Sequence, residues 1–172
     1  MPLKIVVEKV TDVQTPCKAH QTDAGIDFYL PSDLEYIVQN GKGINIGLYT
    51  RPLDPTNDTI TSTAVEIRPH ESVLLPMGVK VNLPDNYGLV FFNRSGIATK
   101  KHLFRGACVV DKGYTGLLYV NLTNVSNNTQ YLLPGEKLIQ AMLLPVPEVD
   151  IEEGKVDIDT ERGEGGFGSS DK

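Results

Sequence analysis

Short apolar runs separated by proline, glycine and asparagine recur along this chain of 172 residues. The runs are rich in Val, Ile and Leu, and their length of a few residues is typical of strands. Turn residues stand between most of them, as in Pro84-Asp85-Asn86. We therefore predict an all-β domain, a barrel or jelly roll, with strands near residues 3–7, 72–75, 78–83, 88–92, 108–110, 117–122 and 137–144.

Two short helices are expected within this framework. Ser32 and Glu35 have the spacing of a capping box, which predicts a helix start at Ser32. Its apolar face would consist of Leu34, Ile37 and Val38. Residues 95–101 are expected to form a second helical turn, whose first amide groups and Ser95 hydroxyl would face an anion.

The chain is long enough for one domain with a hydrophobic core, which we expect at residues 1–147. From residue 148 onwards, acidic residues alternate with two apolar pairs, Val149/Ile151 and Val156/Ile158. Such a segment has little to pack on by itself. We interpret residues 148–172 as an extended arm that packs on a neighbouring subunit and ends in a glycine-rich lid.

Composition argues against several classes of protein. A net charge of −6 does not suit a protein that binds nucleic acid, because phosphate neutralisation requires clustered Lys and Arg. The three histidines are scattered and make no zinc spacing with Cys17 or Cys108. No apolar run approaches the roughly 20 residues of a membrane span, and the N-terminus does not resemble a signal peptide. We expect a cytoplasmic protein, in the host cytoplasm if the source is viral or a phage.

The tail from Arg162 to Asp171 combines four glycines with a cation, one aromatic ring and two hydroxyls. Its Gly163-x-Gly165-x-x-Gly168 spacing is not a dinucleotide-binding loop, because no helix can follow so close to the end of the chain. Two interpretations remain open from composition alone. The tail is either a solubilising, disordered terminus or a lid that closes over a nucleotide.

Asp111 follows the apolar run 108–110 and precedes the turn residue Gly113, so it is expected at the end of a strand. A carboxylate placed there can be partly desolvated and act as a general base. The segment alone favours the other interpretation, in which Asp111 only stabilises the turn. Tyr114 is either a site residue or a core or hairpin aromatic.

Three other segments carry polar groups in apolar surroundings. Asp27 is flanked by apolar residues, and Arg94-Ser95-Gly96 offers a cation, a hydroxyl and a flexible backbone. Gln140 lies inside an apolar run, where an amide requires a partner. A ligand phosphate would be one such partner.

In this order the segments resemble the five motifs of the trimeric deoxyuridine triphosphate nucleotidohydrolases, the dUTPases. The motifs correspond to Ala24-Gly25-Ile26-Asp27, Arg94-Ser95-Gly96, residues 106–116, residues 135–140 and residues 162–170. The resemblance covers most of the chain, and the glycine-rich tail is close to specific for the family. It favours the lid over the solubilising terminus.

The resemblance implies hydrolysis of dUTP to dUMP and pyrophosphate. Asp111 would deprotonate the water that attacks the α-phosphorus, Mg²⁺ would be held mainly by the triphosphate and water, and Asp27 would help to place the metal shell. Phosphate oxygens would be bound from the core by Arg94, Ser95, Gly96 and Gln140, and from the tail by Arg162, Gly168, Ser169 and Ser170. Phe167 would stack over uracil.

The resemblance also implies that the backbone from Gly106 to Val110 pairs with the edge of uracil and that Tyr114 presses against C2′ of the sugar. The family's pocket is shared between the subunits of a homotrimer. The chain departs from the family at Asn93, where proline is common, at Lys112-Gly113, where acids are common, and at Arg105, whose role is open. About 30 extra residues, roughly 33–64, form an insert with a possible protein partner.

Two alternatives accompany the dUTPase assignment. A dCTP deaminase shares the fold but not the RGEGGFGSS tail or the Val-Val-Asp-x-x-Tyr segment. A regulatory protein would keep the nucleotide site and act on a partner through the insert.

Overall fold

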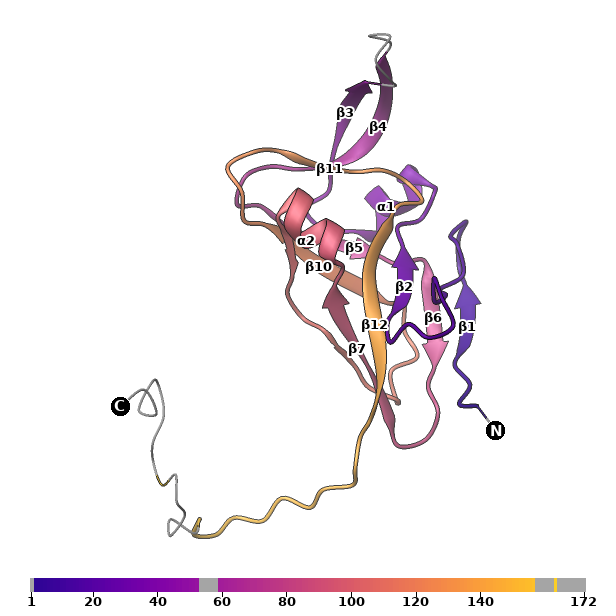
Figure 1. Ribbon diagram of the computed structural model, residues 1–172, viewed down its shortest axis with the longest axis vertical. Coiled ribbons are helices and arrows are strands. Elements are labelled where there is room, and N and C mark those ends of the chain that lie inside the picture. The colour runs from indigo at the N-terminus through magenta and orange to yellow at the C-terminus, as the bar shows by residue number, and fades with distance from the viewer. Residues whose placement is uncertain (1, 53–58, 157–162, 164–172) are drawn as a thin grey trace.

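The chain is described by a computed structural model that covers residues 2–52, 59–156 and 163. Within these residues the chain forms twelve strands and two short helices (Figure 1). In chain order they are β1 (Val6–Lys9), β2 (Ile26–Tyr29), α1 (Leu34–Asn40), β3 (Asn45–Pro52), β4 (Thr59–Ile67), β5 (Ser72–Pro76), β6 (Val79–Asn82), β7 (Tyr87–Asn93), α2 (Ser95–Lys101), β8 (Leu103–Arg105), β9 (Val109–Val110), β10 (Tyr119–Asn124), β11 (Gln130–Leu132) and β12 (Lys137–Pro145). The predicted all-β, jelly-roll-like class is confirmed.

One antiparallel sheet, in the order β2-β12-β7-β9, positions the predicted site residues. Gln140 on β12 pairs with Asp27 on one side and with Phe92 on the other. Since directly paired residues share a face of a sheet, these three side chains project from the same face. The other sheets have the orders β5-β10-β8, β11-β4-β3 and β1-β6.

The hydrophobic core lies behind the opposite face of this sheet. Leu89 and Phe91 on β7 and Ile139 on β12 are almost fully buried, whereas Phe92 is only partly buried. This alternation is the period-2 pattern of a strand with one face in the core. Phe28 on β2 packs edge-to-face on Phe91, with ring centroids 5.4 Å apart. The core thus fixes which face of the sheet is left for a ligand.

Both helices lie where the sequence predicts them, but the start and the buried face of the first helix differ from the prediction. Helix α2 covers the predicted residues 95–101. Helix α1 is capped by Asp33, whose carboxylate accepts from the amide of Tyr36, and not by Ser32 as predicted. The helix starts one residue later because Asp33 is itself a strong N-cap. Val38 is 47% exposed and does not belong to the buried face.

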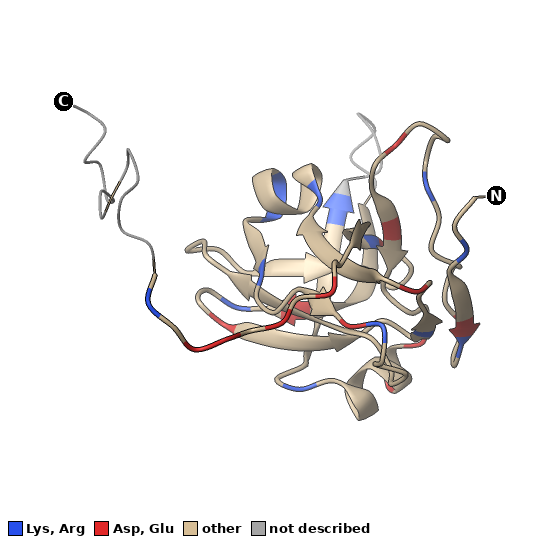
Figure 2. Ribbon diagram, turned by 90° about the horizontal axis from the view of Figure 1, so that it is seen from below, with Lys and Arg blue, Asp and Glu red and all other residues tan. Residues whose placement is uncertain are grey.

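Two segments project from the body. The β3–β4 hairpin stands out at the top of Figure 1, and the chain after β12 leaves at the bottom. Residues 147–156 form no helix or strand and are exposed. Acidic residues follow one another along this arm in Figure 2. The described part of the predicted arm is therefore extended, with Ile151 96% exposed.

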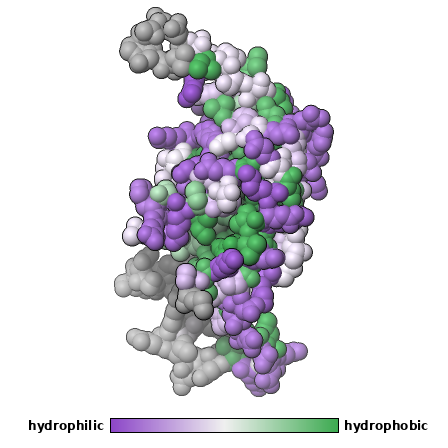
Figure 3. Space-filling view, turned by 90° about the vertical axis from the view of Figure 1, so that its right-hand side faces the viewer, coloured by the Kyte–Doolittle hydropathy of each residue, from purple (hydrophilic) through white to green (hydrophobic). Residues whose placement is uncertain are grey.

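Apolar side chains also reach the surface elsewhere. Figure 3, which looks onto the β1 side of the molecule, shows an apolar patch within a mostly hydrophilic face. In and beside β1, Leu3, Val6 and Val10 are exposed. None of the helices in the described ranges has the length and apolar character needed to cross a membrane.

Candidate active site

The Asp27 carboxylate is the centre of an ion-pair network at the end of the sheet. Arg94 Nε donates to Asp27 Oδ1 and Lys137 Nζ donates to Oδ2, both at 2.8 Å. Arg94 also donates from Nη1 to the Lys137 carbonyl at 3.3 Å. Asp27 is only 7% exposed, and a charge so well buried requires this compensation. The network joins β2, the start of α2 and the start of β12.

Gln140 lies beside this network and already has a protein partner. Its Nε2 donates to the Asn93 carbonyl at 2.9 Å. Gly25 approaches the same amide, because a Cβ atom added at Gly25 would lie 2.6 Å from Gln140 Oε1. The partner that Gln140 was expected to require is therefore present within the protein. One Nε2 hydrogen is used within the protein and the second is left for a ligand.

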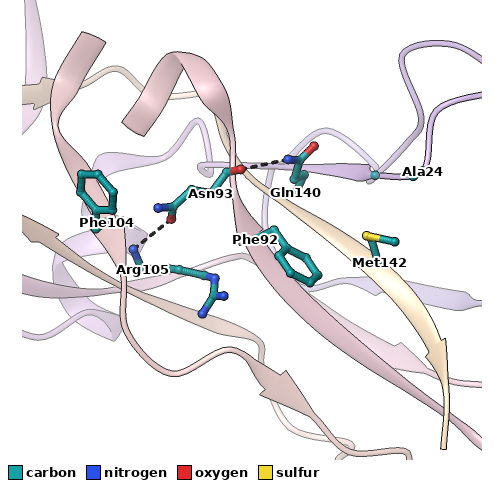
Figure 4. A pocket seen from close by; sticks show the side chains of 8 residues that line it. Ala24, Phe92, Asn93, Phe104, Arg105, Gln140 and Met142 are labelled. Carbon is teal, nitrogen blue, oxygen red and sulfur yellow. Dashed lines mark hydrogen bonds between the residues drawn. The ribbon is translucent and has the colours of Figure 1, made fainter. Parts of the chain in front are cut away.

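A cavity of about 570 Å³ brings these groups together. Its lining residues are Ala19, His20, Asp23, Ala24, Gly25, Asp27, Asn93, Arg94, Ser95 and Gln140. A second cavity of about 650 Å³ adjoins it and shares Ala24, Gly25, Asn93 and Gln140 (Figure 4). Its remaining walls are Phe92, Phe104, Arg105 and Met142. The first cavity is lined mainly by polar and charged residues, and the second adds the apolar walls of Phe92, Phe104 and Met142 to Arg105.

Sequence reasoning missed several members of this region. Lys137, Asn93 and the His20–Asp23 pair were not predicted as site residues. The His20 amide donates to Asp23 Oδ2 at 2.9 Å and lowers the pKa of that carboxyl. Lys137 directly follows Gly135-Glu136 in the fourth motif segment, and its basic character next to an apolar run was the available signal.

Tyr29 is a buried aromatic residue next to the Asp27 ion-pair network. Its hydroxyl contacts Cys17 Sγ at 3.3 Å, and Lys137 Nζ lies 5.9 Å from the centre of its ring. Burial raises the pKa of Tyr29 to about 12. The phenol is therefore neutral at physiological pH, and its role is to pack against Lys137 and Cys17.

Asp111 and Tyr114 lie apart from these cavities. Strand β9 pairs Val110 with Leu89, at the far end of β7 from Asn93. Leu89 and Asn93 are four positions apart on the strand, a distance of roughly 14 Å. Asp111 lines another cavity, of about 300 Å³, with Gly88, Leu144 and Val146 among its walls. One chain therefore does not unite Asp111 with Arg94 and Gln140.

The third motif segment has its own local order. Asp111 is exposed, which corrects the expectation of a partly desolvated carboxylate within one chain. The Tyr114 amide donates to the Asp111 carbonyl at 3.0 Å, and the Tyr114 hydroxyl donates to the Leu117 carbonyl at 2.7 Å. The Gly106 amide donates to the Asn121 carbonyl at 2.9 Å. Val110 is 8% exposed and anchors the segment in the core.

Two predicted groups have simpler surroundings. Ser95 is exposed and lines the polar cavity. A Cβ atom added at the next residue, Gly96, would meet no other atom within 4 Å. Residues Arg162, Phe167, Gly168, Ser169 and Ser170 lie outside the described residues.

Metal binding through the protein alone is not supported by the described part of the chain. It contains no group of three or more His, Cys, Asp or Glu side chains that could hold an ion. Both oxygens of Asp27 accept from cations, although a carboxylate has further lone pairs. Asp27 therefore fits contact with a metal-bound water and does not fit a dedicated protein cage.

The fold and the cavities define a jelly-roll-like β protein with a cation-lined cavity at the end of one sheet. The dUTPase family model matches residues 43–171. The chain belongs to the dUTPase family.

Relatives agree with this assignment. A deoxyuridine 5′-triphosphate nucleotidohydrolase of Hydrogenobaculum sp. (strain Y04AAS1) is 36% identical over 108 residues, which cover 62% of this chain and 75% of the relative. Among solved structures, a mutant dUTPase of Staphylococcus bacteriophage 80alpha with dUpNHpp has a TM-score of 0.72 at 21% identity, covering 97% of this chain and 98% of that one. A mutant dUTPase of phage phi11 of S. aureus, described with a structural Mg(II) ion, has a TM-score of 0.66 at 19% identity, covering 90% and 98%.

Proposed function

We propose that the protein hydrolyses dUTP to dUMP and pyrophosphate. The observation that carries the proposal is one polar cavity lined by Asp27, Arg94, Ser95 and Gln140 in a chain of the dUTPase family. The curated relative named above is a dUTP nucleotidohydrolase, and the family match extends into the glycine-rich tail.

Asp111 acts as the general base in this proposal. It takes a proton from the attacking water as the water oxygen bonds to the α-phosphorus and the bond to the leaving pyrophosphate breaks. Its exposure in a single chain leaves the carboxylate accessible to a water and a ligand.

The phosphates are bound by the groups of the polar cavity. Arg94 has donors beyond the Nε that holds Asp27, Ser95 offers its hydroxyl and Gly96 its unobstructed backbone. Gln140 contributes its second Nε2 hydrogen. From the tail, Arg162, Gly168, Ser169 and Ser170 complete the phosphate contacts, and Phe167 stacks on the base.

Uracil is selected by the backbone between Gly106 and Val110. Amide and carbonyl groups at fixed positions match the edge of uracil and leave cytosine with unpaired groups, which costs several powers of ten in specificity. Tyr114, tied by its hydroxyl to the Leu117 carbonyl, is held in place to exclude a ribose hydroxyl.

The residues of this site fit a Mg²⁺ ion that binds together with the triphosphate of the substrate. When bound it would offset the charge of the triphosphate. Asp27 would contact its water shell, since its two oxygens are already shared with Arg94 and Lys137. The phage phi11 dUTPase with its structural Mg(II) ion is a precedent within the fold.

A homotrimer with shared sites accounts for the separation of Asp111 from Arg94. The roughly 14 Å between their ends of β7 is bridged if one subunit supplies Asp111 and Tyr114 and another supplies Arg94 and Gln140. The extended arm after β12 supports the same proposal, with residues 1–147 as the β domain and 148–172 as the arm and lid. The free cysteines Cys17 and Cys108 fit the reducing cytoplasm.

The test is to incubate the protein and Mg²⁺ with each deoxynucleoside triphosphate in turn. We expect pyrophosphate release from dUTP alone, with no ammonia. Ammonia release from dCTP would identify a deaminase, and no reaction with any of the nucleotides would contradict the proposed activity.

A further inference from the structure

Residues 106–110, the base-reading segment of the proposed function, begin directly after strand β8. Strand β8 ends at Arg105 and β9 begins at Val109, so residues 106–108 belong to no strand. Selection between bases requires amide and carbonyl groups at fixed positions, because a mismatched base is rejected only where the groups that face it cannot move to meet it. The bonds that fix this segment therefore decide how well uracil is distinguished.

Two backbone hydrogen bonds hold the first part of the segment. The Gly106 amide donates to the Asn121 carbonyl of β10 at 2.9 Å, and the Phe91 amide of β7 donates to the Cys108 carbonyl at 2.8 Å. Since both bonds join main-chain groups, they do not depend on which side chains stand there.

Asn93 supplies a further bond from a side chain. Its Oδ1 accepts from the Arg105 amide at 3.0 Å, and its own carbonyl accepts from Gln140 Nε2 at 2.9 Å. Figure 4 shows Asn93 between these two partners, with both bonds dashed. Asn93 ends β7, and its backbone pairs with Ile139 in the sheet. A side chain that belongs to the sheet thus fixes the residue from which the base-reading segment starts.

Arg105 is held by its side chain as well. Its guanidinium lies 5.5 Å from the centre of the Phe92 ring, and its Nη1 donates to the Gly106 carbonyl at 3.4 Å. A guanidinium stacked on an aromatic face has lost part of its freedom before any ligand binds. Two neighbouring residues of β7, Phe92 and Asn93, therefore hold Arg105 at its side chain and at its backbone.

We propose that Asn93 is a positioning residue for base selection, whose side-chain oxygen holds the start of the base-reading segment where uracil is favoured over cytosine. The inference rests on the proposed function and names a determinant of its selectivity. Proline, which is common at this position in the family, has no side-chain acceptor. Without the Asn93 oxygen the Arg105 amide has only water as a partner, and the segment gains the freedom to adapt to cytosine.

Calorimetric titration with non-hydrolysable analogues of dUTP and dCTP in Mg²⁺ buffer tests the proposal without any turnover. We expect the ratio of the two Kd values, which measures the preference for uracil, to fall about tenfold in Asn93→Leu, because leucine has a similar volume and no acceptor. Asn93→Asp keeps the oxygen, and its added charge weakens both triphosphates alike, so the ratio should be retained. Asn40→Leu is the matched control, since Asn40 donates to the Tyr36 carbonyl at 2.9 Å and lines neither cavity.

An unchanged ratio in Asn93→Leu would overturn the inference even if both affinities or the urea midpoint fell, because Asn93 would then act on the phosphates or on stability alone. Should Asn93→Leu fail to fold, Asn93→Ala removes the same oxygen without added bulk and is judged by the same ratio. A wild type that binds both analogues equally would also overturn the inference. Selective binding of the uracil analogue without pyrophosphate release from dUTP would contradict the proposed function, while the ratios would still decide the role of Asn93.

Discussion

The Asp27 carboxylate holds the Arg94 guanidinium at 2.8 Å across 67 residues of sequence. This bond ties the second strand to the residue that precedes α2, so the first two motif segments form one unit before any ligand arrives. Lys137 adds a third segment through the other oxygen of Asp27. The polar cavity is thus preorganised by charge pairing.

Substitution Asp27→Asn should lower the free energy of unfolding by roughly 1–3 kcal/mol, because two cations lose their counter-charge. The loss is smaller than for a fully buried pair, since the side chains of Arg94 and Lys137 are 29% and 36% exposed. Urea denaturation measures the change. The control is Asp85→Asn, whose pair with Lys112 is exposed to solvent and should contribute little to stability. Equal effects of the two substitutions would contradict the structural role of Asp27.

Substitution Asp111→Asn should lower kcat for dUTP about 100-fold or more, because the attacking water loses its base. Binding of a non-hydrolysable dUTP analogue should be retained. Asp111 is exposed, so the urea midpoint should not change. Steady-state kinetics and calorimetry separate the two effects, with Asp12→Asn as the control at another exposed carboxylate. Turnover at the wild-type rate would remove Asp111 as the base.

Most of the β framework was predictable because its strands are apolar and bounded by turn residues. All seven predicted strands overlap an observed one, with ends displaced by a few residues. Five of the strands in the described ranges were missed. Strands β8 and β11 have three residues each, too few for a pattern, and β2 carries the charged Asp27. In the outer part of the β3–β4 hairpin, apolar residues alternate with Thr, Ser and Gly, and Leu48 and Ile60 are exposed because this part projects from the body.

The site was predictable in its residue types and not in its geometry. The resemblance named Asp27, Arg94 and Gln140, and their shared cavity follows from strand pairings that no local pattern specifies. The ion pair of Asp27 with Lys137 spans 110 residues, and such a contact leaves no periodic signal. The distance between Asp111 and Arg94 could not be predicted either, because it depends on which end of β7 pairs with β9.

Truncation after Glu161 should leave a folded protein with severely reduced hydrolysis. The truncation leaves the β domain and the exposed residues 148–156 in place. The expected loss follows from removing Arg162, Phe167, Ser169 and Ser170 from the proposed lid. Circular dichroism would monitor folding and pyrophosphate release would monitor activity. A truncated protein with full activity would show that the tail is dispensable.

Substitution Gly25→Ala should weaken substrate binding without unfolding the protein. The new methyl group would lie 2.6 Å from Gln140 Oε1, so the amide must turn away from the Asn93 carbonyl. Loss of one such hydrogen bond predicts a KM for dUTP that is roughly five- to tenfold higher. At Gly154 a Cβ meets nothing within 4 Å, which makes Gly154→Ala the control. An unchanged KM in Gly25→Ala would mean that Gln140 does not contact the substrate.

The insert at residues 33–64 divides into a structural and a projecting part, and the two should respond differently to deletion. Ile37 and Ala64 are fully buried, so removal of the whole insert should prevent folding. The outer hairpin is different. Leu48 pairs directly with Thr63, and an Asn-Gly turn in place of residues 49–62 would close the strands there.

The shortened hairpin should retain dUTP hydrolysis within about twofold. It loses the contact between the Tyr49 and Tyr131 rings, whose centroids are 5.4 Å apart, and with it about 1 kcal/mol of stability. Neither the cation-lined cavities nor the Asp111-lined cavity includes any residue of this hairpin. Activity assays together with size-exclusion chromatography measure the outcome. A loss of turnover in a variant that keeps its assembly would show that the projecting hairpin contributes to the active site of another subunit.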